Sequence, residues 1–253
     1  MDLFSLVGKN ILVTGASSGL GRQTAISCSE SGAKVILVAR NKERLEDTRQ
    51  RMKNPELHLI YCVDLLDYDA IEPIIKNAVD QLGKLDGLVN AAGISTTLPL
   101  KLTSPEKIDH FFRTNVTSAI QLTRLFTKPA YCNNNGASIV FLSSVMGIVG
   151  EAGKTLYSLT KGALISGAKS IALELASKKI RVNTISPGVV VTPMSQNAVY
   201  SQDEESLQKI KALHPLGLGL PEDIAQACIY LLSDASRWVT GINLVIDGGY
   251  TAR

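Results

Sequence analysis

The sequence predicts an α/β protein in which a doubly wound, seven-stranded parallel sheet carries helices on both faces within a single domain, residues 1–253. Short apolar runs alternate with helical periods along the whole chain, which is typical of right-handed βαβ crossovers. The run KVILVA at 34–39 is almost continuously apolar, as expected for a strand that is buried on both faces. No internal repeat and no linker rich in proline, glycine or serine divides the chain.

Each element is expected from its own stretch of sequence. Short apolar runs predict strands at 10–14, 34–39, 57–63, 87–90, 137–142, 180–185 and 242–246. Helical periods predict helices at 19–31, 42–53, 68–82, 104–132, 155–177 and 221–232. Asn41 is placed to cap the second helix and Pro221 opens the last. The stretch 188–220 fits neither pattern, and we expect a substrate lid there, with a decorated surface loop as the alternative.

Composition excludes several classes of protein. The chain has 26 basic and 23 acidic residues, a net charge of +3, which gives no reason to expect a nucleic-acid partner. It has no apolar run of about 18 residues, as a membrane span requires, and no basic start followed by an apolar run, as a secretory signal requires. Its cysteines have neither CxxC nor metal-ligand spacing: Cys28, Cys62, Cys132 and Cys228. We therefore expect a reduced, cytoplasmic, metal-free protein.

A glycine-rich turn follows the first predicted strand and opens the first predicted helix. Gly15, Gly19 and Gly21 have the spacing G-x-x-x-G-x-G. Glycine lets the backbone approach a ligand, and the helix N-terminus offers free N–H groups and the positive end of its dipole to a pyrophosphate. The turn therefore predicts a dinucleotide site, with tight packing alone as the alternative.

The end of the second predicted strand indicates which dinucleotide is bound. An acidic residue there would bind the ribose 2′-hydroxyl of NAD, but Ala39 is followed by Arg40 and Asn41. A guanidinium can hold a 2′-phosphate in a two-pronged contact, so the sequence favours NADP(H) over NAD(H). The alternative is that Arg40 is a solvated cation at the start of a helix.

Three residues suggest a catalytic group. Tyr157 and Lys161 share one face at the start of the helix expected at 155–177, and Ser144 follows the strand expected at 137–142. Ligands of open α/β sheets bind beyond the carboxyl ends of the strands, where Ser144 falls. A neighbouring ammonium stabilises phenolate and so lowers the pKa of a tyrosine, which would make Tyr157 a general acid or base tuned by Lys161. A Tyr-x-x-x-Lys pair by itself occurs in many helices by chance.

The joint pattern resembles the short-chain dehydrogenase/reductase family, in its compact single-domain branch, along essentially the whole chain. The matching residues are Thr14-Gly15-x-x-x-Gly19-x-Gly21, Asp64, Asn90-Ala91-Ala92-Gly93, Asn115, Ser144, Tyr157-x-x-x-Lys161, Pro187-Gly188 and Ile246-Asp247-Gly248-Gly249. The resemblance implies a Rossmann-type fold and an oxidoreductase that transfers a hydride between an NAD(P) cofactor and a ketone or secondary alcohol. It also implies that Lys161 bonds the nicotinamide ribose, that Ser144 holds the substrate oxygen, and that Asn115 supports a water relay.

The resemblance and the glycine-rich turn together give a set of expected cofactor contacts. They are Gly15, Ser17, Ser18, Gly19, Leu20, Gly21, Arg40, Asn41, Asp64, Leu65, Asn90, Ala91, Ala92, Gly93, Tyr157, Lys161, Pro187, Gly188, Val190 and Thr192. By resemblance Asp64 contacts the adenine, although it could instead cap the helix that starts near Asp67. The three histidines, His58, His110 and His214, have no partner at catalytic spacing and are expected to be structural or solvent-facing.

The substrate is expected to contact variable segments at 95–100, 147–153 and 189–218, which are mostly apolar and show no basic cluster to clamp a carboxylate or phosphate. The pattern is similar to 3-oxoacyl-acyl-carrier-protein reductases, which implies an acyl-thioester or other small carbonyl substrate. Ser18 departs from it, because those reductases have arginine there. The alternatives are an NADP-dependent alcohol, sugar or secondary-metabolite dehydrogenase and a non-catalytic nucleotide sensor. The resemblance further implies a homotetramer, or a homodimer.

Overall fold

The computed structural model describes residues 2–196 and 203–252, and its centre is one sheet of seven parallel strands. The strand order is β3-β2-β1-β4-β5-β6-β7, so the predicted doubly wound sheet is confirmed. The strands are β1 (Asn10–Thr14), β2 (Lys34–Ala39), β3 (Leu59–Cys62), β4 (Gly87–Asn90), β5 (Ala137–Leu142), β6 (Ile180–Pro187) and β7 (Asn243–Ile246).

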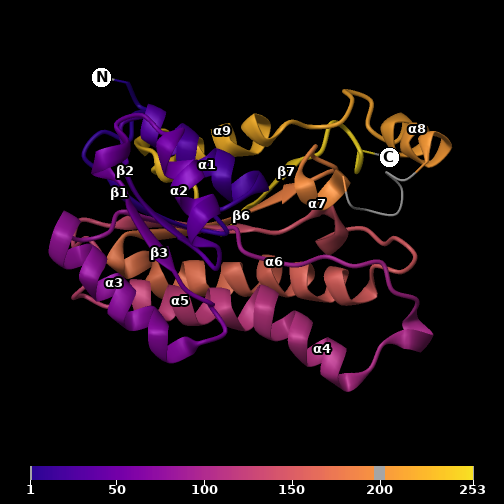
Figure 1. Ribbon diagram of the computed structural model, residues 1–253, viewed down its shortest axis with the longest axis horizontal. Coiled ribbons are helices and arrows are strands. Elements are labelled where there is room, and N and C mark those ends of the chain that lie inside the picture. Colours follow the sequence, from indigo (N-terminus) through magenta and orange to yellow (C-terminus); the bar gives the residue numbers. More distant parts are fainter. Residues whose placement is uncertain (1, 197–202, 253) are drawn as a thin grey trace.

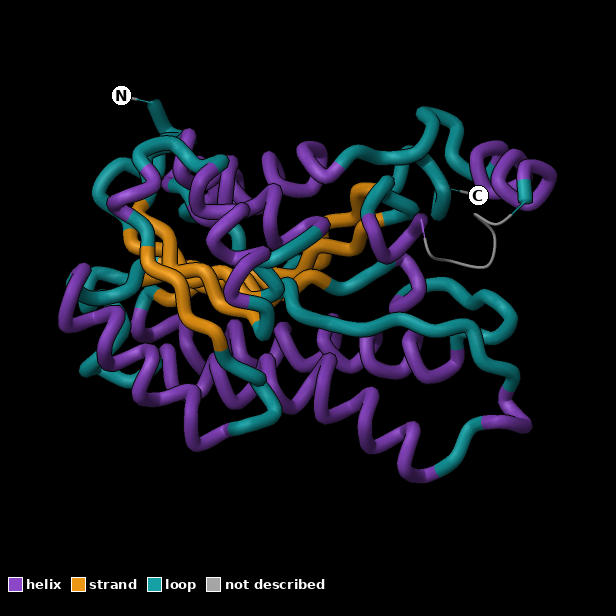
Figure 2. The backbone as a smooth tube through the Cα atoms, viewed as in Figure 1, coloured by secondary structure: helices purple, strands orange, loops and turns teal. Residues whose placement is uncertain are grey.

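Helices cover both faces of this sheet (Figures 1 and 2). One face carries α1 (Gly19–Glu30), α2 (Lys42–Gln50) and α9 (Pro221–Leu232). The other face carries α3 (Tyr68–Leu82), α4 (Pro105–Phe112), α5 (Ser118–Phe126) and α6 (Thr155–Leu175). Alternate side chains of each strand enter the two apolar cores: in β1, for example, Ile11 and Val13 face α1 and α9, whereas Leu12 faces α3 and α5. Burial on both faces is why the strands read as continuous apolar runs.

The direction of winding reverses between β1 and β4, which are neighbours in the sheet. The carboxyl ends of two such strands diverge into a crevice, because the connections that follow them run to opposite faces. Thr14 links these two ends: its hydroxyl accepts the N–H groups of Ala91 and Ala92 at 3.0 and 3.1 Å. The fold therefore opens a ligand crevice beside the glycine-rich turn.

Two stretches differ from the sequence expectation. The helix expected at 104–132 is divided by a π-helical turn at Arg113–Thr117, and its last α-helical residue is Phe126. The stretch 188–220 contains helices α7 (Pro193–Gln196) and α8 (Glu204–Ala212). Asp203 caps α8 by accepting the N–H of Ser206 at 2.8 Å, and the helix has acidic residues in its first turn and lysines in its last. These helix signals are present in the sequence, but the surrounding prolines and glycines obscure them.

His214 anchors the stretch that contains α8 to the rest of the fold. Its Nε2 accepts the N–H of Val189 at 3.1 Å, and its ring stacks on Tyr250 with 4.9 Å between centroids. His58 is also buried, and its Nδ1 accepts the N–H of Val35 at 3.0 Å. Both histidines are therefore structural, as the sequence predicts.

Candidate active site

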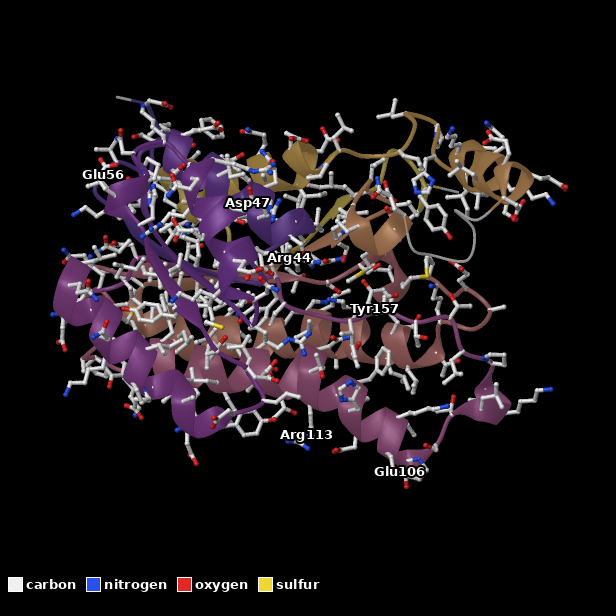
Figure 3. All side chains as sticks on the ribbon, in the orientation of Figure 1. Arg44, Asp47, Glu56, Glu106, Arg113 and Tyr157 are labelled. Carbon is white, nitrogen blue, oxygen red and sulfur yellow. The ribbon has the colours of Figure 1, made fainter. Side chains whose placement is uncertain are left out.

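A cavity of about 570 Å³ runs along the carboxyl ends of the strands, from the β2–α2 connection to the start of α6. Residues of both helical layers line it, among them Arg44 of α2 and Tyr157 of α6, which are labelled in Figure 3. Most of the predicted site residues share its wall: Gly15, Ser17, Ser18, Gly19, Leu20, Gly21, Arg40, Asn41, Asp64, Leu65, Ala91, Ala92, Gly93, Tyr157, Lys161 and Thr192.

The glycine-rich turn forms one wall of the cavity. Gly15 and Gly19 have φ angles of +65° and +54°, in the left-handed region that favours glycine. A Cβ on Gly21 would lie 2.5 Å from the carbonyl oxygen of Gly15, so a side chain there would displace the turn itself. The first-turn N–H groups of α1 have no acceptor within the helix and point outward at its N-terminus. A pyrophosphate fits this wall, since backbone donors and the helix dipole act on it together.

Two contacts fix the glycine-rich turn against α2. Arg22 donates to the carbonyl oxygen of Ser17 at 2.8 Å and pairs with Asp47 at 3.0 Å. Thr48 donates to the carbonyl oxygen of Ala16 at 2.9 Å. The phosphate end of the cavity and the helix that follows Arg40 are thus held as one unit.

Cationic side chains line the end of the cavity beyond β2. Arg40 is exposed and forms part of the wall, and Asn41 caps α2 by accepting the N–H of Arg44 at 2.8 Å. Arg44, in the first turn of α2, also lines the wall, and it was not among the predicted site residues. Two guanidinium groups therefore border the region next to the end of β2.

Asp64 lines the same region and does not cap a helix. Its carboxylate accepts the N–H of Leu66 at 3.0 Å, whereas α3 is capped by Asp67, which accepts from Ala70. The helix-cap alternative for Asp64 is therefore wrong. His110 lines the cavity too, which distinguishes it from the other two histidines.

The opposite end of the cavity is formed by α6. One helical turn separates Tyr157 from Lys161, and the Lys161 Nζ lies 5.5 Å from the centroid of the Tyr157 ring. Lys161 is buried and donates to the carbonyl oxygen of Leu142 at 2.7 Å. Burial lowers the pKa of its ammonium to about 8, because a low-dielectric environment disfavours the charged form. Below that pH the cation favours ionisation of the neighbouring phenol.

The two serines that follow β5 make different contacts. The Ser143 hydroxyl donates to the carbonyl oxygen of Lys161 at 2.8 Å and so fixes α6 to the end of β5. Ser144 is buried, and its oxygen accepts the N–H of Met146 at 3.2 Å. A hydroxyl that accepts one bond can still donate its own proton. These contacts agree with a structural Ser143 and a Ser144 that is suited to hold a substrate oxygen, although Ser143 and not Ser144 borders the cavity.

Asn115 lies in the π-helical turn between α4 and α5, behind the cavity wall. Its amide donates to the Ile94 carbonyl and the Thr160 hydroxyl, each at 3.0 Å, and accepts the Ile94 N–H at 2.8 Å. A Cβ on Gly93 would lie 3.2 Å from the Asn115 Oδ1 and 3.6 Å from the Lys161 Nζ. Gly93 therefore lets both polar groups approach the same point. Single π turns are common at functional sites.

The remaining predicted contacts lie outside the cavity wall. Asn90 is buried and its amide donates to Thr123 at 3.3 Å, while its Oδ1 has no hydrogen-bond partner among the described residues. Gly188 passes so close to the Asp247 backbone that a Cβ there would lie 2.9 Å from the Asp247 Cα. Val190 is buried beside Gly219. Pro187, the last residue of β6, precedes this close approach.

Metal-binding clusters and membrane-spanning helices are both absent from residues 2–196 and 203–252. No group of three or more histidine, cysteine or carboxylate side chains there could hold a metal ion. No helix in these ranges is long and apolar enough to cross a membrane.

Known proteins are similar to this chain over almost its whole length. A family model described as "Enoyl-(Acyl carrier protein) reductase" matches residues 15–251. The 3-oxoacyl-acyl-carrier-protein reductase of Thermotoga maritima is 36% identical over 246 residues, 96% of this chain and 98% of that protein. The L-xylulose reductase of Mus musculus is 35% identical over the full length of both chains. The cyclopentanol dehydrogenase of Comamonas testosteroni is 36% identical over 96% of this chain and 97% of its own.

Solved structures of dehydrogenases are also similar to this chain over almost its whole length. A short-chain type dehydrogenase/reductase of Mycobacterium marinum has a TM-score of 0.89 at 29% identity, and the match covers 100% of this chain and 98% of that chain. A 7α-hydroxysteroid dehydrogenase in complex with NADH and 7-oxoglycochenodeoxycholic acid has a TM-score of 0.92 at 29% identity, covering 98% and 96%.

Proposed function

Since the chain belongs to the short-chain dehydrogenase/reductase family, we propose that Tyr157, Lys161, Ser144 and Asn115 form its catalytic group and that its cofactor is NADP(H). The chain is an oxidoreductase that interconverts a ketone and a secondary alcohol. One observation carries the catalytic proposal: a buried ammonium lies 5.5 Å from the ring of a tyrosine that borders the cavity.

In the proposed mechanism Tyr157 moves the proton and the other polar side chains orient the reacting oxygen. In reduction the Tyr157 phenol donates its proton to the carbonyl oxygen, and in oxidation the phenolate removes the alcohol proton. Lys161 stabilises the phenolate, and Ser144 donates a hydrogen bond to the same substrate oxygen. Asn115 holds the Ile94 backbone beside Lys161 and supports a water relay to that lysine. When bound, the nicotinamide supplies or accepts the hydride.

Arg40 and Arg44 support the preference for NADP(H). Both guanidinium groups border the cavity beyond β2, where an NAD-selective protein has a carboxylate at the strand end. A 2′-phosphate between them would receive charge-assisted hydrogen bonds, which are stronger than those to a neutral hydroxyl. Asp64 and Leu65, on the same wall, would border the adenine.

For the substrate we propose a small carbonyl compound, with a 3-oxoacyl group as the leading candidate. The reductase of Thermotoga maritima supports this choice, and the L-xylulose reductase and cyclopentanol dehydrogenase keep a sugar or alcohol substrate as the second candidate. We interpret residues 1–253 as one domain in which 188–220 is a lid; its described parts contain α7 and α8, and its residues 197–202 lie outside the described residues. Thr192 and Met194 of this stretch border the cavity, and Thr192 lies against Gly19 of the glycine-rich turn, which supports that role.

A cofactor-oxidation assay tests the proposed activity. The full chain is mixed with NADPH or NADH and a panel of a 3-oxoacyl thioester, a cyclic ketone and a ketose, and the nicotinamide absorbance is followed. We expect consumption with at least one substrate and a higher kcat/KM with NADPH than with NADH. Binding of NADPH without consumption for any ketone would instead favour the non-catalytic nucleotide sensor.

We also propose that the chain forms a homotetramer, or a homodimer, in the cytoplasm. Large apolar side chains are exposed next to the edge strand β7 and along α6, among them Trp238 at 92% and Leu173 at 80% exposure. Exposed edge strands and apolar patches of this kind are typical of subunit contacts. The four cysteine thiols are free, as in reducing compartments. Light scattering should give two or four times the chain mass of 27.1 kDa, and a monomer would contradict the assembly.

A further inference from the structure

Lys154 is a buried cation whose position is unexplained by the proposed catalytic group. The described residues contain two buried lysines, Lys161 at 6% and Lys154 at 9% exposure. In the proposed mechanism Lys161 stabilises the phenolate of Tyr157. Lys154 stands at the N-terminus of α6, three residues before Tyr157, so that it lies on a neighbouring part of the same helix face. The segment 147–153, which is expected to contact the substrate, contains no basic residue, and Lys154 follows it directly.

The contacts of Lys154 leave its charge without a counter-ion among the described residues. Its Nζ donates to the Thr97 hydroxyl at 2.8 Å, and none of the salt bridges of the described chain includes it. An ammonium has three donors, and a neutral hydroxyl satisfies one of them. Burial of a charge is costly unless the charge is paired and hydrogen-bonded. Lys154 therefore favours an anion as its partner.

Lys154 and Thr97 lie where the segment that follows β4 meets the start of α6, although neither residue is part of the cavity wall described above. Thr97 belongs to the segment that leaves β4 and passes Lys161 at Gly93 before it reaches α6. This segment meets the start of α6 directly, because the N–H of Leu98 donates to the Gly153 carbonyl at 2.7 Å. Lys154 is the N-cap residue of α6, and Tyr157 is the third residue of that helix. The first-turn N–H groups of the 21-residue helix α6 add a positive dipole end at the same place.

We propose that Lys154 binds a carboxylate of the substrate, so that the preferred substrate is an oxo acid or hydroxy acid with a free carboxylate near the reacting carbon. This inference rests on the proposed function and, among the small carbonyl compounds proposed there, selects the free 3-oxo acid in place of the thioester that the carrier-protein reductase would use. A thioester would replace the carboxylate with an uncharged group. The phosphate of a pantetheine carrier is negatively charged, but many bonds separate it from the keto carbon, so it would not reach Lys154 while that carbon lies at Tyr157. The free acid is therefore favoured over its thioester, and over a neutral ketone.

Paired substrates with and without the charge test this role. The full chain is assayed in the oxidation direction with NADP⁺ and either 3-hydroxyhexanoate or its methyl ester. We expect the kcat/KM of the wild-type protein to be about 10–100-fold higher for the acid, the range expected for one charge-assisted hydrogen bond. Lys154→Met should remove most of this preference, chiefly by raising KM for the acid. Lys154→Arg keeps the charge and should restore part of the preference. Lys169→Met, which removes an exposed charge from the same helix, should leave the acid-to-ester ratio unchanged.

A binding measurement decides the question without turnover. Calorimetry in the presence of NADP⁺ should show that hexanoate binds the wild-type protein more tightly than methyl hexanoate does, and that Lys154→Met abolishes the difference. If the wild-type protein had equal kcat/KM values and equal affinities for acid and ester, the role of Lys154 would be wrong. The same would follow if Lys154→Met lowered kcat/KM for acid and ester by the same factor. Failure of the chain to oxidise any alcohol would contradict the proposed function instead, while the binding comparison still decides the inference.

Discussion

Tyr157→Phe is expected to lower kcat by about 10²–10⁴, the usual contribution of a positioned general acid or base. The substitution removes the hydroxyl that would exchange a proton with the substrate oxygen and keeps the ring. Its neighbour Lys161 keeps its hydrogen bond to the Leu142 carbonyl, so the cavity should retain its shape. The measurement is single-turnover reduction of the best ketone from the substrate panel.

Two comparisons separate loss of chemistry from loss of structure. The dissociation constant of NADPH, from its fluorescence, should change less than about threefold in Tyr157→Phe. Tyr61→Phe removes the same hydroxyl on β3, where Tyr61 donates to Asn77 at 2.6 Å, and should turn over normally. If Tyr157→Phe kept near-normal turnover, Tyr157 would not be the proton donor.

Arg40→Asp is expected to reverse the cofactor preference. A carboxylate at the end of β2 would repel the 2′-phosphate of NADP and could accept the ribose 2′-hydroxyl of NAD. Loss of one charge-assisted contact together with the new repulsion should raise the KM for NADP by about 100-fold, and the KM for NAD should fall. Initial rates with both cofactors at saturating substrate measure the two constants.

Lys42→Asp is the matched control, because it makes the same change of charge two residues away on an exposed side chain outside the cavity wall. It should leave the ratio of the two constants nearly unchanged. An unchanged KM for NADP in Arg40→Asp would contradict the assigned role of Arg40. A similar rise in both variants would indicate long-range electrostatics and not a specific contact.

The strands were predictable because the sheet is parallel and covered on both faces. In β2 the burial of Val35–Val38 follows directly from the apolar run. The N-cap Asn41 and the first-turn proline Pro221 were predictable for a different reason, because helix ends follow local sequence rules. The π-helical turn at Arg113–Thr117 was not predictable, because neither composition nor period distinguishes it from the α-helices on either side.

The site was predictable where its residues are close in sequence or follow a strand end. Tyr157 and Lys161 share a helix and line one cavity, whereas of the two serines only Ser143 borders it, so the role of Ser144 stays a prediction. Arg44 and Lys154 were missed for a different reason. Arg44 only shares the cavity wall with the glycine-rich turn, and Lys154 bonds to Thr97, 57 positions away in the sequence. A local sequence pattern carries no signal for either arrangement.

The hydrogen bond from Ser143 to the Lys161 carbonyl has an evolutionary consequence. It attaches the helix that carries Tyr157 and Lys161 to the central sheet, whereas the segments that we propose to face the substrate lie outside the strands of that sheet. Mutation can therefore remodel those segments and leave the arrangement of tyrosine and lysine intact. Proteins with this architecture can therefore acquire a new substrate specificity by changes in those segments alone. The relatives of this chain agree with this, because they include enzymes named for a sugar, a cyclic alcohol and an acyl chain.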